Sequence, residues 1–181
     1  SDIFSYYNLN AKLDRLLERK VWLDSGAYLV IDQTEALTVI DVNTGKFTGD
    51  SRLADTILET NLEAAREIAK QIRLRSIGGI IIIDFIDMDS DEHRSMVKSA
   101  LEEAVREDKV KTNIVGFTGL GLMELTRKKV RNNLKSIMQT ACPYCAGSGA
   151  VLNNISVVHN LRGELGRLFE NTNAGCVLLT V

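Results

Sequence analysis

The chain has 181 residues, of which 45% are hydrophobic and 25% are charged, and its formal net charge is −2. These values are typical of a soluble globular protein and exclude a disordered chain. The longest apolar runs, such as Ile80–Ile83, are far too short to cross a bilayer, so we predict no membrane-spanning segment. Because the chain begins at Ser1 and not with Met, we expect a piece of a longer protein.

The first third of the chain alternates between helical and strand patterns. Leucines recur at helical spacing over residues 5–19 and predict an amphipathic helix. Two apolar, β-branched runs at residues 27–32 and 36–42 follow, and the short polar segment between them predicts a hairpin. Residues 43–52 are polar and Gly-rich, which indicates a loop.

A helix and a buried strand come next. Apolar residues follow a 3.6-residue period over residues 53–75, and we expect Ile77-Gly78-Gly79 to end this helix. The continuous apolar run Ile80–Ile83 is typical of a strand that is buried on both faces. The hairpin, helix and strand together predict an α/β fold with a mixed sheet that contains a β-α-β unit.

The remaining elements are shorter. Cap-type residues at 89–91 predict the start of a helix that continues to about Glu107. Residues 113–117 and 122–127 each predict a short strand. Further on, residues 154–170 look helical and residues 175–181 look like a strand, so we expect a small α+β appendage.

Two aspartates stand where strands of the β-α-β unit end. Asp41 follows Val39-Ile40, and Asp84 follows four isoleucines. A right-handed crossover places the carboxyl ends of two parallel strands at the same edge of the sheet, where ligands of open α/β sheets usually bind. Two neighbouring carboxylates repel each other unless they share a proton or a cation. The pair therefore predicts a Mg²⁺ site, and the amide of Asn43 is placed to orient Asp41 or to hold a bound water.

The alternative is that these aspartates only cap turns, since Asp is common at strand ends. Asp32 also ends an apolar run, and we interpret it as a turn residue of the hairpin. Asp87 and Asp89 are likewise interpreted as turn and cap residues. The paired carboxylates alone leave both interpretations open.

Cys142 and Cys145 have the spacing at which two thiolates bind one zinc ion, and Gly147 and Gly149 allow the backbone to fold around it. A structural zinc site needs four ligands, and the sequence contains no second CxxC. Two chains that each donate one pair would complete the site and form a dimer. A thiol redox protein is the alternative, but the poor helix sequence after Cys145 favours zinc.

Basic residues gather between positions 127 and 135 and offer contacts to phosphates, although a solvated polar face would have the same composition. We select Arg127, Lys128 and Lys129 as candidate RNA-binding residues. In the loop beside Asn43, Lys46 is a candidate phosphate contact. Phe47 is a candidate stacking residue or, alternatively, part of the core.

The same segments resemble the ribonuclease E/G family in order and spacing. The matching segments are Ile31–Asn43, Thr60-Asn-Leu-Glu-Ala-Ala65, Arg73-Leu-Arg-x-x-Gly-Gly79, Ile83-Asp-Phe-Ile-Asp-Met88 and Cys142-Pro-x-Cys145. The resemblance implies a deoxyribonuclease I-like catalytic subdomain at residues 26–135. It also implies that residues 1–25 end a ribonuclease H-like portion, that residues 136–151 form a zinc link, and that residues 152–181 begin a small C-terminal domain.

The resemblance further implies roles for individual residues. Asp41 and Asp84 match the magnesium-binding aspartates, and Asn43 matches the asparagine that assists them. Cys142 and Cys145 match cysteines through which two protomers share one zinc ion, which implies a homodimer or a larger homo-oligomer. The family's OB-fold RNA-binding domain lies upstream of these motifs, so we expect a catalytic fragment.

From the residues and the resemblance together, we predict a magnesium-dependent endoribonuclease that hydrolyses single-stranded RNA to 5′-phosphate and 3′-hydroxyl ends, in RNA processing and decay. A non-catalytic RNA-binding or dimerisation module is the alternative. Such a module would bind RNA equally well after both aspartates are changed to asparagine.

Overall fold

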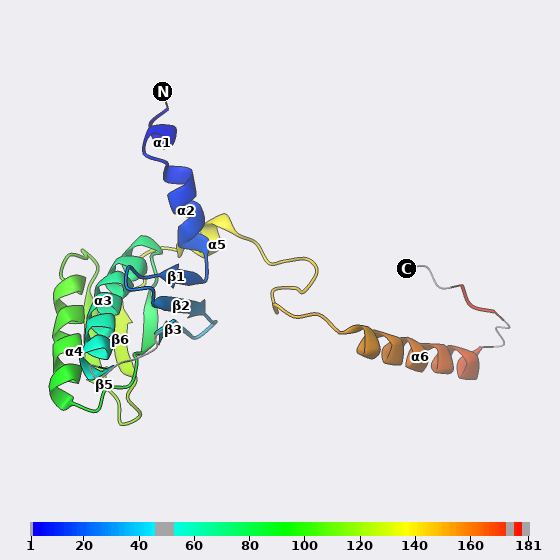
Figure 1. The fold of residues 1–181 in the computed structure, drawn as a ribbon. Coiled ribbons are helices and arrows are strands. Elements are labelled where there is room, and N and C mark those ends of the chain that lie inside the picture. The colour runs from blue at the N-terminus through cyan, green and yellow to red at the C-terminus, as the bar shows by residue number, and fades with distance from the viewer. Residues whose placement is uncertain (1, 46–52, 173–175, 179–181) are drawn as a thin grey trace. The chain divides into compact units, whose positions relative to one another are not determined.

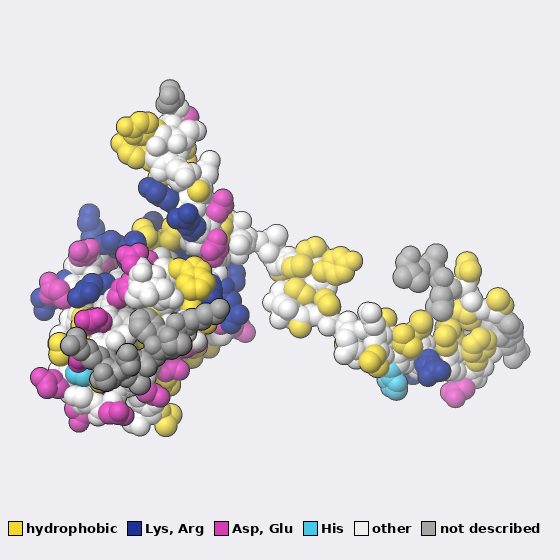
Figure 2. Space-filling model, viewed as in Figure 1, with side chains coloured by type: hydrophobic (Ala, Val, Ile, Leu, Met, Phe, Trp, Pro, Cys, Tyr) yellow, Lys and Arg dark blue, Asp and Glu magenta, His cyan; other side chains and the backbone are white. Residues whose placement is uncertain are grey.

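The computed structural model describes residues 2–45, 53–172 and 176–178. The chain forms two units, Ser1–Gln139 and Thr140–Val181 (Figure 1). Lys, Arg, Asp and Glu side chains are interspersed over the visible face of the first unit (Figure 2). None of the described helices combines the length and the apolar character needed to cross a membrane.

The described part of the first unit contains a six-stranded mixed sheet in the order β1-β2-β3-β4-β6-β5. Only β3 and β4 pair in parallel, and all other neighbours are antiparallel. The predicted α/β class, hairpin and β-α-β unit are therefore confirmed. The strands are β1 (Lys20–Trp22), β2 (Tyr28–Gln33), β3 (Leu37–Asn43), β4 (Gly79–Asp84), β5 (Thr112–Phe117) and β6 (Met123–Arg127).

Helices α3 (Leu53–Leu74) and α4 (Asp91–Val105) lie side by side on one face of this sheet (Figure 1). Alternate residues of the strands point toward them and are fully buried, as Ile81 and Ile83 are. Ile80, on the opposite face, is 50% exposed. No described helix covers that second face, which we call the open face, so the prediction that this strand is buried on both sides is wrong.

Helix α3 ends before the glycines that were expected to end it. Ser76 adopts the left-handed conformation at φ 56°, and its N–H donates to the carbonyl of Arg73. The N–H of Ile77 donates to the carbonyl of Ile72, which completes a Schellman motif. Gly78 serves a different purpose, because a Cβ at this position would lie 2.9 Å from the Cα of Lys129.

The N-terminal helical segment is divided in two. Helices α1 (Ile3–Tyr6) and α2 (Leu9–Leu17) are separated at Asn8, whose φ of 50° is incompatible with a continuous helix. A short helix, α5 (Leu134–Met138), ends the first unit.

In the second unit, helix α6 (Asn154–Asn171) confirms the helix predicted at residues 154–170. The side chain of Asn153 accepts a hydrogen bond from the N–H of Ser156 and caps its start. The predicted strand at residues 175–181 is not seen at residues 176–178, and the other positions lie outside the described residues.

Candidate functional site

The parallel pairing of β3 with β4 brings the two predicted aspartates together. Asp41 and Asp84 are direct partners in the register of these strands, near the carboxyl end of each. Neighbouring strands lie about 4.8 Å apart, so the two side chains leave the sheet side by side. The placement expected from the β-α-β unit is therefore present in the structure.

Both carboxylates belong to the open face. Their neighbours along the strands, Ile40, Val42 and Ile83, are buried against the helices, and alternation turns the aspartates the other way. Asp41 is half-buried, whereas Asp84 is exposed. Among the described elements, α3 and α4 therefore do not separate either carboxylate from solvent.

Asn43 holds Asp41 in place. Its side-chain nitrogen Nδ2 donates a hydrogen bond of 2.7 Å to Oδ2 of Asp41. Both residues lie on the same face of β3, two positions apart. The amide orients one carboxylate oxygen of Asp41, which is one of the two roles that the sequence offered for Asn43.

Three carboxylates act on one another at this edge of the sheet. Although Asp84 as a residue is exposed, desolvation of its carboxyl by neighbouring atoms raises its pKa above the ordinary value, and the negative charges of Asp41 and Asp87 raise it further. The sequence interpretation treated Asp87 as a turn residue and did not foresee its effect on Asp84. The sequence feature that could have indicated this effect is the short separation of the two aspartates, since Asp87 follows Asp84 by three residues.

Asn61 of α3 fixes the segment that carries Asp87. Its amide donates to the carbonyl of Ile86 at 2.8 Å and accepts from the N–H of Ile86 at 3.1 Å, and the side chain is fully buried. These two hydrogen bonds tie the loop after β4 to the helix. The signal in the sequence was a polar residue on the apolar face of a helix, which must find partners when it is buried.

The loop after Asn43 approaches the turn between β1 and β2 closely. Gly45 has a φ of 66°, and a Cβ on it would lie 2.6 Å from the carbonyl oxygen of Gly26. Glycine is therefore needed at this position. The predicted RNA-contacting residues Lys46 and Phe47 lie outside the described residues.

The donors at this edge suit a hard divalent cation. Asp41, Asp84 and the amide of Asn43 offer oxygen ligands, and Mg²⁺ is commonly held by one or two carboxylates together with waters and substrate phosphates. Among the described residues, no group of three or more His, Cys, Asp or Glu side chains is arranged to bind a metal. The two carboxylates and one amide oxygen would leave the other positions around such an ion to waters and substrate phosphates, as is usual for Mg²⁺.

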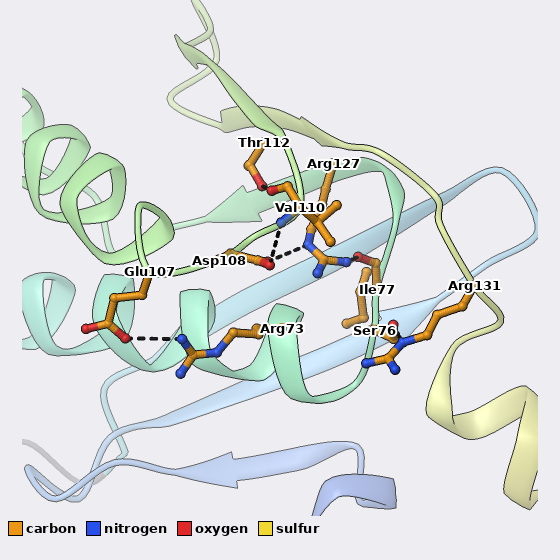
Figure 3. A network of polar contacts seen from close by, with 9 residues as sticks. All are labelled: Arg73, Ser76, Ile77, Glu107, Asp108, Val110, Thr112, Arg127 and Arg131. Carbon is orange, nitrogen blue, oxygen red and sulfur yellow. Dashed lines mark hydrogen bonds and ion pairs between the residues drawn. The ribbon is translucent and has the colours of Figure 1, made fainter.

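Arg127 lies apart from this site and is buried. The residue is 4% exposed; its Nε donates to Asp108 at 2.8 Å and its terminal nitrogen donates to the carbonyl of Ile77 at 2.7 Å (Figure 3). These contacts tie β6 to the loop before β5 and to the turn after α3. The predicted contact of Arg127 with RNA does not agree with this position, because its buried guanidinium already donates hydrogen bonds to Asp108 and to the carbonyl of Ile77.

Lys128 and Lys129 are exposed, but at the far end of the sheet. They follow Arg127, which pairs with Gly79 at the start of β4, whereas Asp84 ends that strand. Five residue steps along a strand span roughly 17 Å. The structure therefore does not bring these lysines next to the carboxylates.

Asp108 and Arg127 form a buried ion pair, with side chains 9% and 3% exposed. Burial raises the pKa of the Asp108 carboxyl, but hydrogen bonds from Arg127 and the N–H of Val110 outweigh it, and the net pKa is lowered. Nearby, Arg131 donates to the hydroxyl of Ser76 at 2.8 Å (Figure 3). Arg127 and Arg131 of the basic segment thus stabilise the fold through contacts inside the first unit.

The predicted zinc residues lie in the second unit, in a turn-rich segment before α6. The Sγ of Cys145 accepts a hydrogen bond from the N–H of Gly149 at 3.3 Å. Hydrogen bonds from the backbone of Gly149 and Gly147 lower the pKa of the Cys145 thiol, which favours the thiolate that zinc requires. Cys142 is exposed and Cys145 is half-buried.

The fold and the site together define an α/β protein with two neighbouring carboxylates on the open face of its sheet. The model of the ribonuclease E/G family matches residues 1–130. The chain belongs to this family.

Several ribonucleases G and E are similar to this chain over most of its length. Ribonuclease G of Salmonella typhimurium is 49% identical over 166 residues, which cover 92% of this chain and 34% of that protein. Ribonuclease G of Escherichia coli is 48% identical over the same shares of both chains. Ribonuclease E of Nostoc sp. is 46% identical over 149 residues, covering 82% of this chain and 22% of that protein. The chain thus spans about a third of the length of these ribonucleases G.

We expect Asp108→Ala to lower the free energy of unfolding by about 3 kcal/mol, because it leaves the Arg127 guanidinium buried without its partner. The matched control is Glu103→Ala, which breaks the exposed pair with Arg106 and should cost less than about 0.5 kcal/mol. Urea denaturation measures both values. Equal effects of the two substitutions would contradict the structural role of the buried pair.

The same pair predicts a dependence on pH. Because the pKa of Asp108 is lower in the folded state, its stabilisation is complete above the unfolded-state pKa of about 3.9 and is lost as the pH falls through the folded-state value. Below about pH 4, the wild type should therefore lose more stability than Asp108→Ala does.

Proposed function

We propose that the chain is the catalytic part of a magnesium-dependent endoribonuclease that hydrolyses single-stranded RNA to 5′-phosphate and 3′-hydroxyl ends, in cytoplasmic RNA processing and decay. The observation that carries the proposal is the direct pairing of Asp41 with Asp84 on an accessible face. Membership of the ribonuclease E/G family supports it. The family relatives are about three times as long, so the activity of the whole protein belongs to the proposal.

In the proposed site, Asp41 and Asp84 hold Mg²⁺. When bound, this ion stabilises charge on a phosphate and lowers the pKa of a water molecule. Asn43 fixes one oxygen of Asp41, so the carboxylate does not need to be reoriented when a ligand binds. Desolvation, together with repulsion by Asp41 and Asp87, raises the pKa of Asp84, and a bound cation would relieve the repulsion.

Residues around the carboxylates would position the RNA. Lys46 and Phe47 follow Asn43 closely along the chain, and we propose that they contact a phosphate and a base. Lys128 and Lys129 are exposed and are proposed to bind phosphates of a strand that continues toward the far end of the sheet. Arg127 is left out of this surface because it is buried.

The remaining parts of the proposal concern organisation. Residues 26–135 would form the deoxyribonuclease I-like subdomain, with residues 1–25 ending a ribonuclease H-like portion. Residues 136–151 would form the zinc link, and residues 152–181 would begin a small C-terminal domain. The accessible half-site of Cys142 and Cys145 supports a zinc ion shared by two protomers.

We expect Asp84→Asn and Asp41→Asn each to slow RNA cleavage by about 1000-fold, since metal stabilisation of phosphate charge is worth several kcal/mol. Cleavage of a labelled single-stranded oligonucleotide is measured during a Mg²⁺ titration. Product ends are identified by kinase labelling, which should require prior removal of a 5′-phosphate. Asp91→Asn, an exposed carboxylate paired with Arg94, is the control and should cleave at the wild-type rate.

Wild-type turnover in chelated, metal-free buffer would contradict the metal-dependent mechanism. If the wild type binds RNA but never cleaves it, and both aspartate variants bind it as tightly, the chain is a binding module and not a nuclease.

Cys142→Ser and Cys145→Ser should each abolish zinc content and convert the dimer to a monomer, because either change leaves fewer thiolates than a tetrahedral site needs. Metal analysis should find one zinc ion for every two wild-type chains, and sedimentation should give the dimer mass. Cys176→Ser is the control, since Cys176 lies outside the CxxC. Two zinc ions in each dimer, or a dimer that survives the loss of zinc, would contradict the shared site.

A further inference from the structure

A cluster of two aromatic rings and one ammonium group lies on the open face, on β2, which pairs with β3, and on the edge strand β1. Trp22 of β1 and Tyr28 of β2 are paired in register, and their ring centroids are 5.2 Å apart. The Nζ of Lys20 lies 4.0 Å from the centroid of the Trp22 ring and 3.5 Å from that of Tyr28. Cation–π attraction at these distances holds the three side chains together.

The cluster is next to the proposed site. Tyr28 is the direct partner of Asn43, and Trp22 is the direct partner of Tyr28. One row across the sheet thus runs from Trp22 through Tyr28 to Asn43, over two strand spacings of about 4.8 Å each. The neighbouring row, two residues along the strands, includes Lys20, Val30 and Asp41.

Trp22 is 63% exposed, although the large aromatic side chain of tryptophan gains much free energy when it is buried. Core packing does not explain its place, because Leu23 and Leu29, its neighbours on the opposite face, already fill the interior. A large aromatic ring kept in solvent next to an acidic metal-type site is well placed to contact a ligand.

A groove of about 710 Å³ begins at this cluster and lies along α2, β1 and α3. Its polar lining is mainly basic, with Lys12, Arg15 and Lys70 in addition to Lys20. Glu18 and Glu67 also line the groove, and Glu67 is paired with Lys70 at 2.9 Å, so the positive charge comes mainly from Lys12, Arg15 and Lys20. Figure 2 shows Lys and Arg side chains, with Asp and Glu side chains beside them, where α2 meets the rest of the first unit. An anionic chain that crosses the sheet edge here meets positive charge.

We propose that Trp22 and Tyr28 form a stacking platform for a base of single-stranded RNA, one or two nucleotides from the phosphate held at Asp41 and Asp84, with Lys20 contacting the backbone. Stacked bases and basic grooves are the usual means of holding single-stranded RNA. The inference rests on the proposed function, because it assumes that RNA lies across the carboxylates. It assigns binding to β1 and β2, outside the residues of the metal site.

The chain itself supplies the probe, because Trp22 is its only tryptophan. Fluorescence is followed while a single-stranded RNA oligonucleotide is added to Asp84→Asn protein without Mg²⁺, so that cleavage does not interfere. Stacking on Trp22 should quench the emission. An oligonucleotide of the same length with abasic sugars keeps every phosphate and should bind without quenching.

Matched substitutions separate stacking from folding. Anisotropy of a labelled oligonucleotide should show about tenfold weaker binding for Trp22→Leu, because a stacked base is lost. Trp22→Phe keeps an aromatic face and should stay within about threefold of the parent. Lys20→Met should flatten the slope of log K against log salt by about 0.7, the value for one phosphate contact of a single strand. Urea midpoints show whether each variant is folded.

The outcomes separate this inference from the proposed function. Unquenched Trp22 in a chain that binds the RNA, equal quenching by the abasic strand, or no RNA binding at all would each overturn the platform. Quenching and a loss of affinity in Trp22→Leu support it even if the wild type fails to cleave RNA with Mg²⁺, in which case the nuclease proposal alone is overturned.

Discussion

The parallel pairing of β3 with β4 is the constraint on which the site depends. One helix, α3, joins the two strands, and its buried face holds them in a register that makes Asp41 the partner of Asp84. A shift of one residue would turn one of the aspartates toward the helices, since side chains alternate between the faces of a sheet. The apolar core thus holds two like charges next to each other.

The two faces of the sheet have different roles: one packs against helices, and the other bears the polar side chains of the site. Helices α3 and α4 cover one side, where the fully buried isoleucines supply stability. The open side bears the carboxylates, Asn43 and the aromatic cluster with Lys20. The buried side chain of Asn61 on α3 binds the backbone of Ile86 and fixes the loop that carries Asp87. The site is therefore built on rigid strands and needs few residues of its own.

The sequence predicted those parts of the structure that follow from periodicity. Alternation and apolar runs located the hairpin and β4, and the crossover rule then placed Asp41 beside Asp84. The effects that were missed depend on long-range packing. Burial of Arg127 requires Asp108, 19 residues away, and the carbonyl of Ile77, 50 residues away. The left-handed conformation of Ser76 after α3 was missed because glycine is the commoner left-handed residue.

The central claim is that Asp41 and Asp84 share one divalent cation. A crystal soaked in Mn²⁺, with anomalous diffraction collected at the manganese edge, tests this directly. The account predicts a single strong peak with oxygen ligands from both carboxylates, and no peak at this position in Asp84→Asn crystals. A fully soaked crystal in which the two carboxylates point apart, or in which the metal binds elsewhere, would contradict it.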